Sequence, residues 1–265
     1  MSAGTLDISV IVITKNEERN LADCLESVRW ARQIVVVDAQ STDRTVEVAR
    51  RFTDDVVVTA WKGYVAAKNT ALGRTAHDWV LWLDADERAM PGLEEEVRRI
   101  VLGAKGGPVA YSIARRAYFL GTWIRHCGWY PGRVVRFFRK SRASFAASHV
   151  HERLVVEGET GRLATDVVHY TDENLYHYFA KLNRYTSLAA ADLVERGRIG
   201  TVRDLLIRPP FLFFKMYFLQ KGFLDGMPGL MLSIASSAYV FTKYAKLYER
   251  TALGERSAPM TEGSR

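Results

Sequence analysis

The first hundred residues alternate between two patterns, and this alternation limits the fold more than any other feature of the sequence. Four short runs rich in β-branched and aliphatic residues are typical of buried strands, and they cover residues 8–14, 33–37, 56–59 and 79–83. Apolar residues at helical spacing follow each run, around residues 21–28, 45–52, 63–72 and 92–102. Strands that alternate with helices in this way predict an α/β fold with a mostly parallel, doubly wound sheet and helices on both faces.

Acidic residues stand where two of these strands end. Asp38 closes the second run, and Asp84 and Asp86 follow the fourth. Because ligands of open α/β sheets bind beyond the carboxyl ends of the strands, we expect these acids to lie at one edge. If residues 84–86 are extended, Asp84 and Asp86 point to the same side. Such a pair suits Mg²⁺ or Mn²⁺, which could clamp a diphosphate; the alternative is a polar turn after a core strand.

Composition excludes several other classes of protein. The 265 residues include 48% hydrophobic and 25% charged residues, as in ordinary globular proteins. No window approaches the roughly 20 apolar residues needed to cross a bilayer, and the first seven residues do not resemble a signal peptide, so we expect a cytoplasmic protein. Cys24 and Cys127 form no C-x-x-C pair, which argues against a disulfide framework or a zinc site. The net charge of +7 favours anionic partners.

Four short motifs follow one another in the first third of the chain. They are Ile-Val-Ile-Thr-Lys-Asn-Glu-Glu at 11–18, Val-Val-Val-Asp-Ala-Gln-Ser-Thr-Asp at 35–43, Lys-Asn at 68–69 and Leu-Asp-Ala-Asp-Glu at 83–87. In order and spacing this set resembles the family 2 glycosyltransferases of the GT-A (Rossmann-like) fold. The resemblance implies an inverting, metal-dependent transfer of a sugar from a nucleotide-sugar, usually a UDP-sugar.

The resemblance also implies roles for residues by their position in the motifs. Donor-binding residues would be Thr14, Asn16 and Glu17 in the nucleotide pocket, Asp38 at the base or ribose, Lys68 near the diphosphate, and Asp84 and Asp86 at the metal and the sugar. The alternative for Lys68 is a solvated helix lysine, and Ser41 and Asp43 are interpreted as helix caps. Where the family commonly has a second acid or small polar residue and then glycine, this chain has Ala39 and Gln40.

Residues 115–142 carry eight basic residues, no acid and several aromatic residues. Such a mixture could bind single-stranded nucleic acid, or a phosphorylated sugar whose ring packs on aromatic faces while arginine binds phosphate. We take Trp129, Tyr130 and Arg136 as candidate acceptor-binding residues. The alternative is that about half of the arginines only solvate a surface. Because the strand-end acids would repel its phosphates, no nucleic-acid partner is expected.

The sequence His149-Val150-His151-Glu152 offers a base. An inverting transfer needs a group that takes the proton of the acceptor hydroxyl, and Glu152 is our candidate, with Asp166 and Asp172 as alternatives. His151 is either a metal ligand beside Asp86 or a residue that orients Glu152. His149 and His169 are interpreted as structural residues.

A more specific resemblance comes from four further segments. Gly-Trp-Tyr-Pro at 128–131, Arg-Phe-Phe at 136–138, Val-His-Glu at 150–152 and His-Tyr at 169–170 resemble the lipopolysaccharide core β-glucosyltransferase branch of the family. An acid often follows Trp-Tyr-Pro in that branch, and Gly132 takes its place here. The branch implies a phosphorylated or lipid-linked glycan acceptor and a hexose such as glucose as the transferred sugar.

From residue 175 the chain is helical and basic, with 12 Lys/Arg against 6 Asp/Glu in residues 175–256. Basic amphipathic helices with aromatic faces lie in the membrane interface, so residues 205–248 predict contact with a membrane surface. The alternative is a helical subdomain packed on the sheet. Residues 254–265 are polar, and we expect a disordered tail there.

These observations divide the chain into four predicted parts: a nucleotide-sugar-binding half at 1–114, an acceptor half with the base at 115–174, a basic amphipathic helical region at 175–253, and the tail. They predict a peripheral glycosyltransferase on the inner face of the cell membrane that builds lipopolysaccharide core or another cell-surface glycan. Two alternatives stay open. One is a glycosyltransferase that acts on polyprenyl phosphate or on another acceptor that is not lipopolysaccharide. The other is a basic nucleic-acid-binding module.

Overall fold

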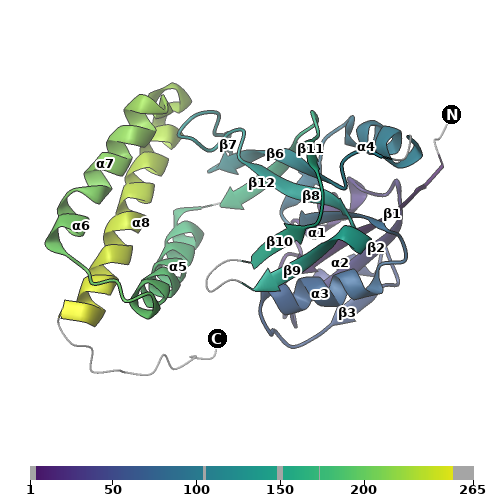
Figure 1. Cartoon of the computed structure of the whole chain (residues 1–265), viewed down its shortest axis with the longest axis horizontal. Helices are drawn as coiled ribbons and strands as arrows, with labels where there is room; N and C mark the ends of the chain where they lie inside the picture. The colour runs from purple at the N-terminus through teal and green to yellow at the C-terminus, as the bar shows by residue number, and fades with distance from the viewer. Residues whose placement is uncertain (1–3, 104–105, 148–151, 173, 253–265) are drawn as a thin grey trace. The chain divides into compact units, whose positions relative to one another are not determined.

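The computed structural model describes residues 4–103, 106–147, 152–172 and 174–252. The chain forms two compact units (Figure 1). The first contains the chain up to Arg125 together with Trp129–Thr171, and the second contains His126–Gly128 and the chain from Asp172 onward.

A ten-stranded sheet, counted over the described residues, forms the centre of the first unit, with the strand order β3-β2-β1-β4-β8-β6-β12-β5, and with β7 and β11 paired to β6. The strands on this path are β1 (Leu6–Thr14), β2 (Ala31–Asp38), β3 (Val56–Val58), β4 (Trp79–Asp84), β5 (Glu87–Ala89), β6 (Ala110–Phe119), β8 (Arg133–Arg139) and β12 (Val167–Asp172); β7 is Thr122–Trp123 and β11 is Thr160–Arg162. The strands β3, β2, β1 and β4 pair in parallel, as predicted. Beyond β4 the sheet continues through antiparallel pairs with β8 and β6, so it is mixed.

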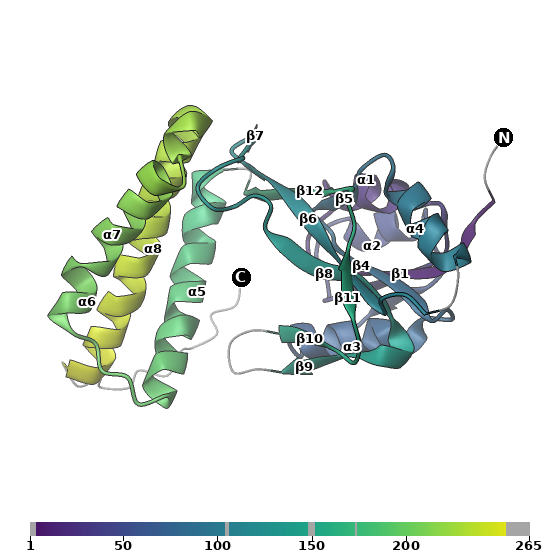
Figure 2. The same ribbon diagram turned by 45° about the horizontal axis from the view of Figure 1, so that its top comes forward.

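Helices cover both faces of the parallel strands, which confirms the predicted layers. The helices α1 (Leu21–Glu26), α2 (Thr45–Ala49) and α4 (Leu93–Leu102) supply apolar residues to one core layer, and α3 (Tyr64–Arg74) supplies the other. Alternate strand residues enter opposite layers: Val10 and Val12 face α1, whereas Ile11 faces α3. Figure 2 shows α3 on the side of the sheet away from α1 and α4.

A separate antiparallel pair lies on the α3 side, formed by β9 (Ala143–Ala147) and β10 (Glu152–Val156). Asn69 Nδ2 donates to the carbonyl oxygen of Phe145 at 3.2 Å, and the Phe145 ring packs edge-on against Trp82. The Phe145 ring also packs edge-on against Phe138, so the pair is attached to α3 by a polar contact and to the sheet by two aromatic contacts.

The second unit is helical, as predicted. It contains α5 (Leu175–Glu195), α6 (Val202–Leu206), α7 (Arg208–Phe214), the π-helical turn η2 (Lys215–Leu219), the 3-10 turn η3 (Gly222–Asp225) and α8 (Gly226–Ala252); a further 3-10 turn, η1 (Lys140–Arg142), belongs to the first unit. Lys246 Nζ on α8 lies 2.7–2.9 Å from four oxygen atoms of α5, to which its three N–H groups donate. Within the described chain, no helix combines the length and the apolar character that crossing a bilayer requires. The predicted tail at 254–265 lies outside the described residues.

Candidate active site

Polar residues meet at the carboxyl-terminal edge of the parallel strands. Strand β1 lies between β2 and β4, and its register pairs Thr14 with Asp38 and Ile13 with Asp84. This confirms that Asp38 and Asp84 end the two strands that flank β1, at one edge of the sheet, where open α/β sheets bind their ligands.

Ser41 connects Asp38 to the loop after β1. Asp38 is buried, and its Oδ1 accepts a hydrogen bond from the Ser41 backbone N–H at 2.8 Å, while its Oδ2 contacts the Ser41 hydroxyl. The Ser41 hydroxyl in turn accepts from the Asn16 N–H at 2.7 Å. The interpretation of Ser41 as a helix cap is wrong, because Arg44 occupies the N-cap of α2. Ser41 instead fixes Asn16 relative to Asp38.

The rest of this loop is held by short polar contacts. The Glu17 N–H donates to Thr45 Oγ1 at 2.8 Å, and Glu17 Oε2 accepts from Asn20 Nδ2 at 2.9 Å. Asp43 Oδ1 accepts from the Thr45 N–H at 3.0 Å, so Asp43 satisfies a backbone donor at the start of α2 although Arg44 is the N-cap residue. Thr14 Oγ1 is buried and has no hydrogen-bond partner within the described ranges.

The two acids after β4 are held by different partners. Strand β4 ends at Asp84 and the next two residues form a turn, so the extended geometry expected for residues 84–86 is wrong. Asp84 Oδ2 pairs with Arg136 Nη2 at 2.5 Å, whereas Asp86 Oδ2 lies 3.3 Å from His169 Nε2. The antiparallel register of β5 and β12 pairs Glu87 with His169, which brings the imidazole to the turn.

Arg136 lies inside the unit, with a side chain that is 1% exposed. Its Nη2 also donates to Glu87 Oε1 at 2.6 Å, and Glu87 Oε2 accepts from the Asp84 N–H at 3.1 Å. The guanidinium carbon lies 4.0 Å from the centroid of the Trp82 ring. The prediction that Arg136 binds the acceptor is therefore wrong, because the Arg136 side chain is itself buried and its Nη2 is already shared between Glu87, which is buried, and Asp84, which is 38% exposed. Arg136 instead holds Asp84 in place.

Lys68 provides a second buried cation beside the same indole. It is 1% exposed, and its Nζ lies 3.4 Å from the Trp82 ring centroid, within the range of cation–π attraction. The alternative of a solvated helix lysine is therefore wrong. Trp82 thus has a lysine and an arginine close to its ring.

These charges act on the pKa values of both acids, Asp84 and Glu87. Burial alone would raise the pKa of Asp84, but the positive charges of Arg136, Lys68 and His169 hold this pKa below its usual range. Burial raises the pKa of Glu87, and the nearby Asp84 charge raises it further, against the effect of Arg136. Asp84 therefore has the lower pKa of the two acids.

The chemistry of the turn suits a divalent ion shared with a substrate. Within residues 4–103, 106–147, 152–172 and 174–252, no three His, Cys, Asp or Glu side chains form a group that could hold a metal. Mg²⁺ is usually bound by one or two carboxylates plus substrate phosphates, so Asp86 with Asp84 nearby fits that kind of site. Burial would lower the pKa of His169, but its contact with Asp86 raises it. His151, the other predicted ligand, lies outside the described residues.

The predicted acceptor residues Trp129 and Tyr130 are partly exposed. Trp129 packs edge-on against Phe119 with ring centroids 6.3 Å apart. The Tyr130 hydroxyl donates to Asp166 Oδ2 at 3.1 Å, and Arg116 Nε pairs with the same oxygen at 2.7 Å. Asp166, an alternative base, is thus buried and already has two partners.

The segment that carries the candidate base is described only in part. The backbone of Glu152 opens β10 opposite Ala147, and its side chain lies outside the described part of the structure. The same holds for the side chain of Asp172, and His149 lies outside entirely.

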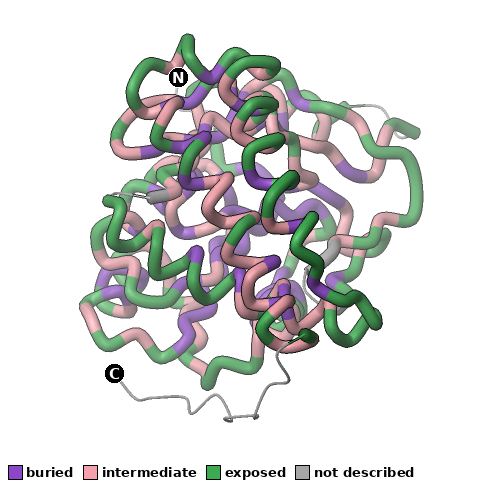
Figure 3. Tube along the Cα trace, turned by 90° about the vertical axis from the view of Figure 1, so that its left-hand side faces the viewer, coloured by how far each residue is buried: buried purple, intermediate pink, exposed green. Residues whose placement is uncertain are grey.

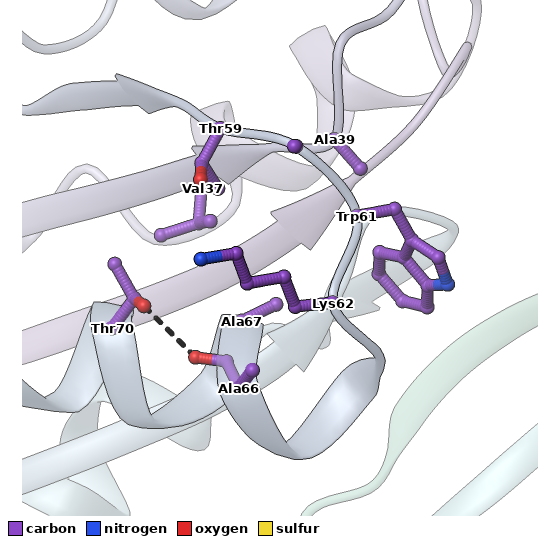
Figure 4. A pocket seen from close by; sticks show the side chains of 9 residues that line it. Val37, Ala39, Thr59, Trp61, Lys62, Ala66, Ala67 and Thr70 are labelled. Carbon is purple, nitrogen blue, oxygen red and sulfur yellow. Dashed lines mark hydrogen bonds between the residues drawn. The ribbon is translucent and has the colours of Figure 1, made fainter.

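A pocket lies between the end of β2, the loop after β3 (Val56–Val58) and the first turns of α3 (Figure 4). Its lining includes the two residues that flank Asp38 in the sequence. It is lined by Val37, Ala39, Thr59, Ala60, Trp61, Lys62, Ala66, Ala67 and Thr70. Figure 4 shows the Lys62 side chain extending into this hollow near Thr59 and Thr70. Asp84 and Asp86 do not line it, so the pocket and the strand-end acids are separate features.

Comparisons with known proteins agree on one family. The sequence profile described as "Glycosyl transferase family 2" matches residues 9–153. The chain is 31% identical over 258 residues to "Lipopolysaccharide core biosynthesis glycosyltransferase LpsC" of Rhizobium meliloti (strain 1021), covering 95% of each chain. It is also 31% identical to "Uncharacterized glycosyltransferase RT0209" of Rickettsia typhi, over 91% of this chain and 87% of that protein. A mannosyltransferase from Pyrobaculum calidifontis, solved with GDP-Man and Mn²⁺, has a similar fold, with a TM-score of 0.53 at 17% identity over 92% of this chain and 87% of that one.

Proposed function

This chain belongs to glycosyl transferase family 2 and is a glycosyltransferase of the GT-A fold, and on that premise we propose that it transfers a hexose such as glucose, with inversion, from a nucleotide-sugar to a phosphorylated, lipid-linked glycan. Its enzymatic identity decides against the basic nucleic-acid-binding module that residues 115–142 left open. A role in lipopolysaccharide core biosynthesis is supported by the name of the Rhizobium relative. We place the enzyme at the inner face of the cell membrane, where such acceptors are found.

The donor binds at the strand-end edge in this proposal. Asp38 and Thr14 meet the nucleoside, and the buried Thr14 hydroxyl, which has no partner in the described ranges, supplies a hydrogen-bonding group there. Asn16 and Glu17 shape the loop that covers it. Asp86, with Asp84 beside it, holds a divalent ion, Mn²⁺ or Mg²⁺; when bound, this ion neutralises charge on the departing diphosphate.

The chemical step needs one proton acceptor. Glu152 takes the proton of the acceptor hydroxyl, whose oxygen forms a bond to the anomeric carbon on the face opposite the diphosphate. The bond from that carbon to the phosphate oxygen breaks, and its electron pair leaves with the nucleoside diphosphate. Trp129 and Tyr130, on the acceptor half of the chain, pack against the acceptor sugar.

The strand register carries this proposal. Because Thr14 pairs with Asp38 and Ile13 with Asp84, the polar residues of three of the four motifs lie at one edge of the sheet. A buried arginine then keeps Asp84 ionised and fixed, which is the preorganisation that a charged leaving group requires.

The test is sugar transfer from a panel of nucleotide-sugars to isolated lipid-linked acceptors, with and without Mn²⁺. We expect one donor to be used, only with metal. Asp86→Asn should abolish metal-dependent turnover, and Glu152→Gln should abolish transfer while leaving donor binding nearly intact. Full turnover by either variant would contradict the role given to that residue.

A further inference from the structure

One face of the helix that runs through α7 and η2 is apolar and exposed. Ile207, Phe211, Phe214 and Phe218 are spaced by four, three and four residues, which places them on one side of a helix, and each is about half exposed or more. Figure 3 shows exposed positions recurring along the helices of this unit. Soluble proteins rarely leave so many aromatic residues in one row uncovered.

A second exposed row lies on α8, which packs beside α7. Met227, Met231, Ile234 and Phe241 are spaced by four, three and seven residues, which also places them on one side of a helix, and all four are exposed. The Ser237 hydroxyl donates to the Pro209 carbonyl at 2.8 Å, so the two helices are in contact. We call these two rows the apolar stripes.

The unit does not use the apolar stripes for its own core. None of the buried positions on the same helices belongs to a stripe; they are Pro209, Met216, Gly229, Leu232, Ser233, Ala235, Tyr244 and Leu247. The stripe residues can therefore be changed without opening the interior of the helical unit.

The exposed charge of this region is entirely positive. Residues 196–248 contain eight Lys/Arg and only two acids, Asp204 and Asp225. The Asp204 carboxylate is 9% exposed and pairs with Arg208, and the Asp225 carboxylate is 3% exposed and lies 2.8 Å from His126 Nδ1. Arg203, Lys215 and Lys221 are exposed. The region thus presents apolar side chains and cations while its acids are shielded.

From this arrangement we propose that the apolar stripes dock on the surface of an anionic lipid bilayer. Phenylalanine, methionine and isoleucine on one helix face insert at the boundary between headgroups and acyl chains, and flanking cations attract anionic headgroups. A second copy of the chain would place like charges opposite each other, which disfavours self-association through this face. The inference deepens the proposed function, since it names the surface that would bring the enzyme to a lipid-linked acceptor.

Flotation of the full chain with vesicles tests the proposal without donor or acceptor, so its failure is distinct from failure of the transferase proposal. We expect binding to phosphatidylcholine vesicles that contain phosphatidylglycerol, and weak binding to phosphatidylcholine alone. Phe211→Ser with Phe218→Ser should lower the partition coefficient roughly tenfold or more. Lys215→Gln with Lys221→Gln should lower it on the order of fivefold for each charge removed, and added salt should act in the same direction.

Matched controls come from the first unit. Leu102→Ser removes an apolar side chain that is more exposed than any stripe residue, and Arg50→Gln removes an exposed cation; both variants should bind like the unaltered chain. Circular dichroism checks that each variant is folded. Equal binding by the unaltered chain and the Phe211/Phe218 variant would overturn the proposal. Equal binding to vesicles with and without phosphatidylglycerol would also overturn it. A third contradicting result would be a chain that does not bind vesicles but forms a dimer, which Phe211→Ser with Phe218→Ser dissociates.

Discussion

The two units distribute charge and apolar surface in opposite ways. At the strand-end edge of the first unit, Lys68 and Arg136 are buried with Glu87, around the Trp82 ring and beside Asp84. In the second unit, apolar rows on α7 and α8 are exposed, and the acids of residues 196–248 are the groups that are shielded.

This difference shows what each region can do. Buried ions lose their hydration, so they persist only in a fixed geometry with close partners. Such a geometry suits a site that must hold Asp84 ionised at one position. Exposed apolar side chains keep their rotamer freedom and suit a deformable partner such as a lipid surface.

The largest loss of stability is expected for Arg136→Met. Removing the cation leaves Asp84 and Glu87 without their shared partner, and the loss in free energy of unfolding should be about 3–5 kcal/mol. Urea denaturation measures it. Arg139→Met is the matched control on the same strand, because the pair of Arg139 with Asp78 is more than one-third exposed on both sides and should contribute about 0–1 kcal/mol. Similar losses in the two variants would remove the distinction between buried and exposed charge.

A smaller effect is expected inside the second unit for Lys246→Met. The three N–H groups of this lysine donate to oxygen atoms of α5, so its loss should reduce the free energy of unfolding by about 1–3 kcal/mol. Lys243→Met, whose Nζ lies 4.6 Å from the Tyr244 ring, is the comparison and should lose about 0.5–1 kcal/mol. If Lys246→Met unfolds at the same urea concentration as the unaltered chain, the contacts between α5 and α8 do not depend on a polar anchor.

The pair of His169 with Asp86 should make stability depend on pH. Burial opposes the charged imidazole, but Asp86 raises the pKa of His169 above its ordinary value. The contribution of this pair to the free energy of unfolding is therefore fully present below about pH 6.5, and it is lost as the pH rises through the pKa of His169 in the folded chain. In metal-free buffer, the difference in free energy of unfolding between the unaltered chain and His169→Gln should therefore decrease as the pH rises above about 6.5. His77→Gln is the control, and a difference that grows with pH would contradict the assignment.

The smallest effect is expected for an exposed pair. Arg51→Ala removes the contact of Arg51 with Glu47, one turn apart at the surface, and should change the free energy of unfolding by only about 0.3–0.5 kcal/mol. A loss comparable with that of Arg136→Met, measured by urea denaturation, would show that burial does not govern the strength of these pairs.

The sequence predicted the parts of the site that depend on local pattern. Strand ends could be placed because apolar runs stop at Thr14, Asp38 and Asp84, and parallel strands bring those ends together. Arg136 was assigned to acceptor binding because arginine beside aromatic residues suits a phosphorylated sugar, and nothing in one sequence marks a buried arginine.

Long-range pairing explains what the sequence did not predict. From the sequence, Trp82 is predicted only as a core residue of a strand and Glu87 only as a residue that follows it. Their partner Arg136 lies about fifty residues further along the chain. His169 was interpreted as a structural residue because a lone histidine most often is one. Its approach to Asp86 depends on the register of β5 and β12. Antiparallel pairings between distant segments leave no local periodic signal.

The most direct test of the account is thermal unfolding of the unaltered chain and of Asp86→Asn with a series of nucleoside diphosphates, with and without Mn²⁺. The account predicts that one nucleoside diphosphate raises the Tm of the unaltered chain by roughly 5–10 °C at about a hundredfold excess over its Kd, only with Mn²⁺. Asp86→Asn should lose this shift, whereas Asp54→Asn, at an exposed loop position, should keep it. A shift that is equal without metal, or that survives in Asp86→Asn, would contradict the claim that the strand-end acids bind a metal-bridged nucleotide.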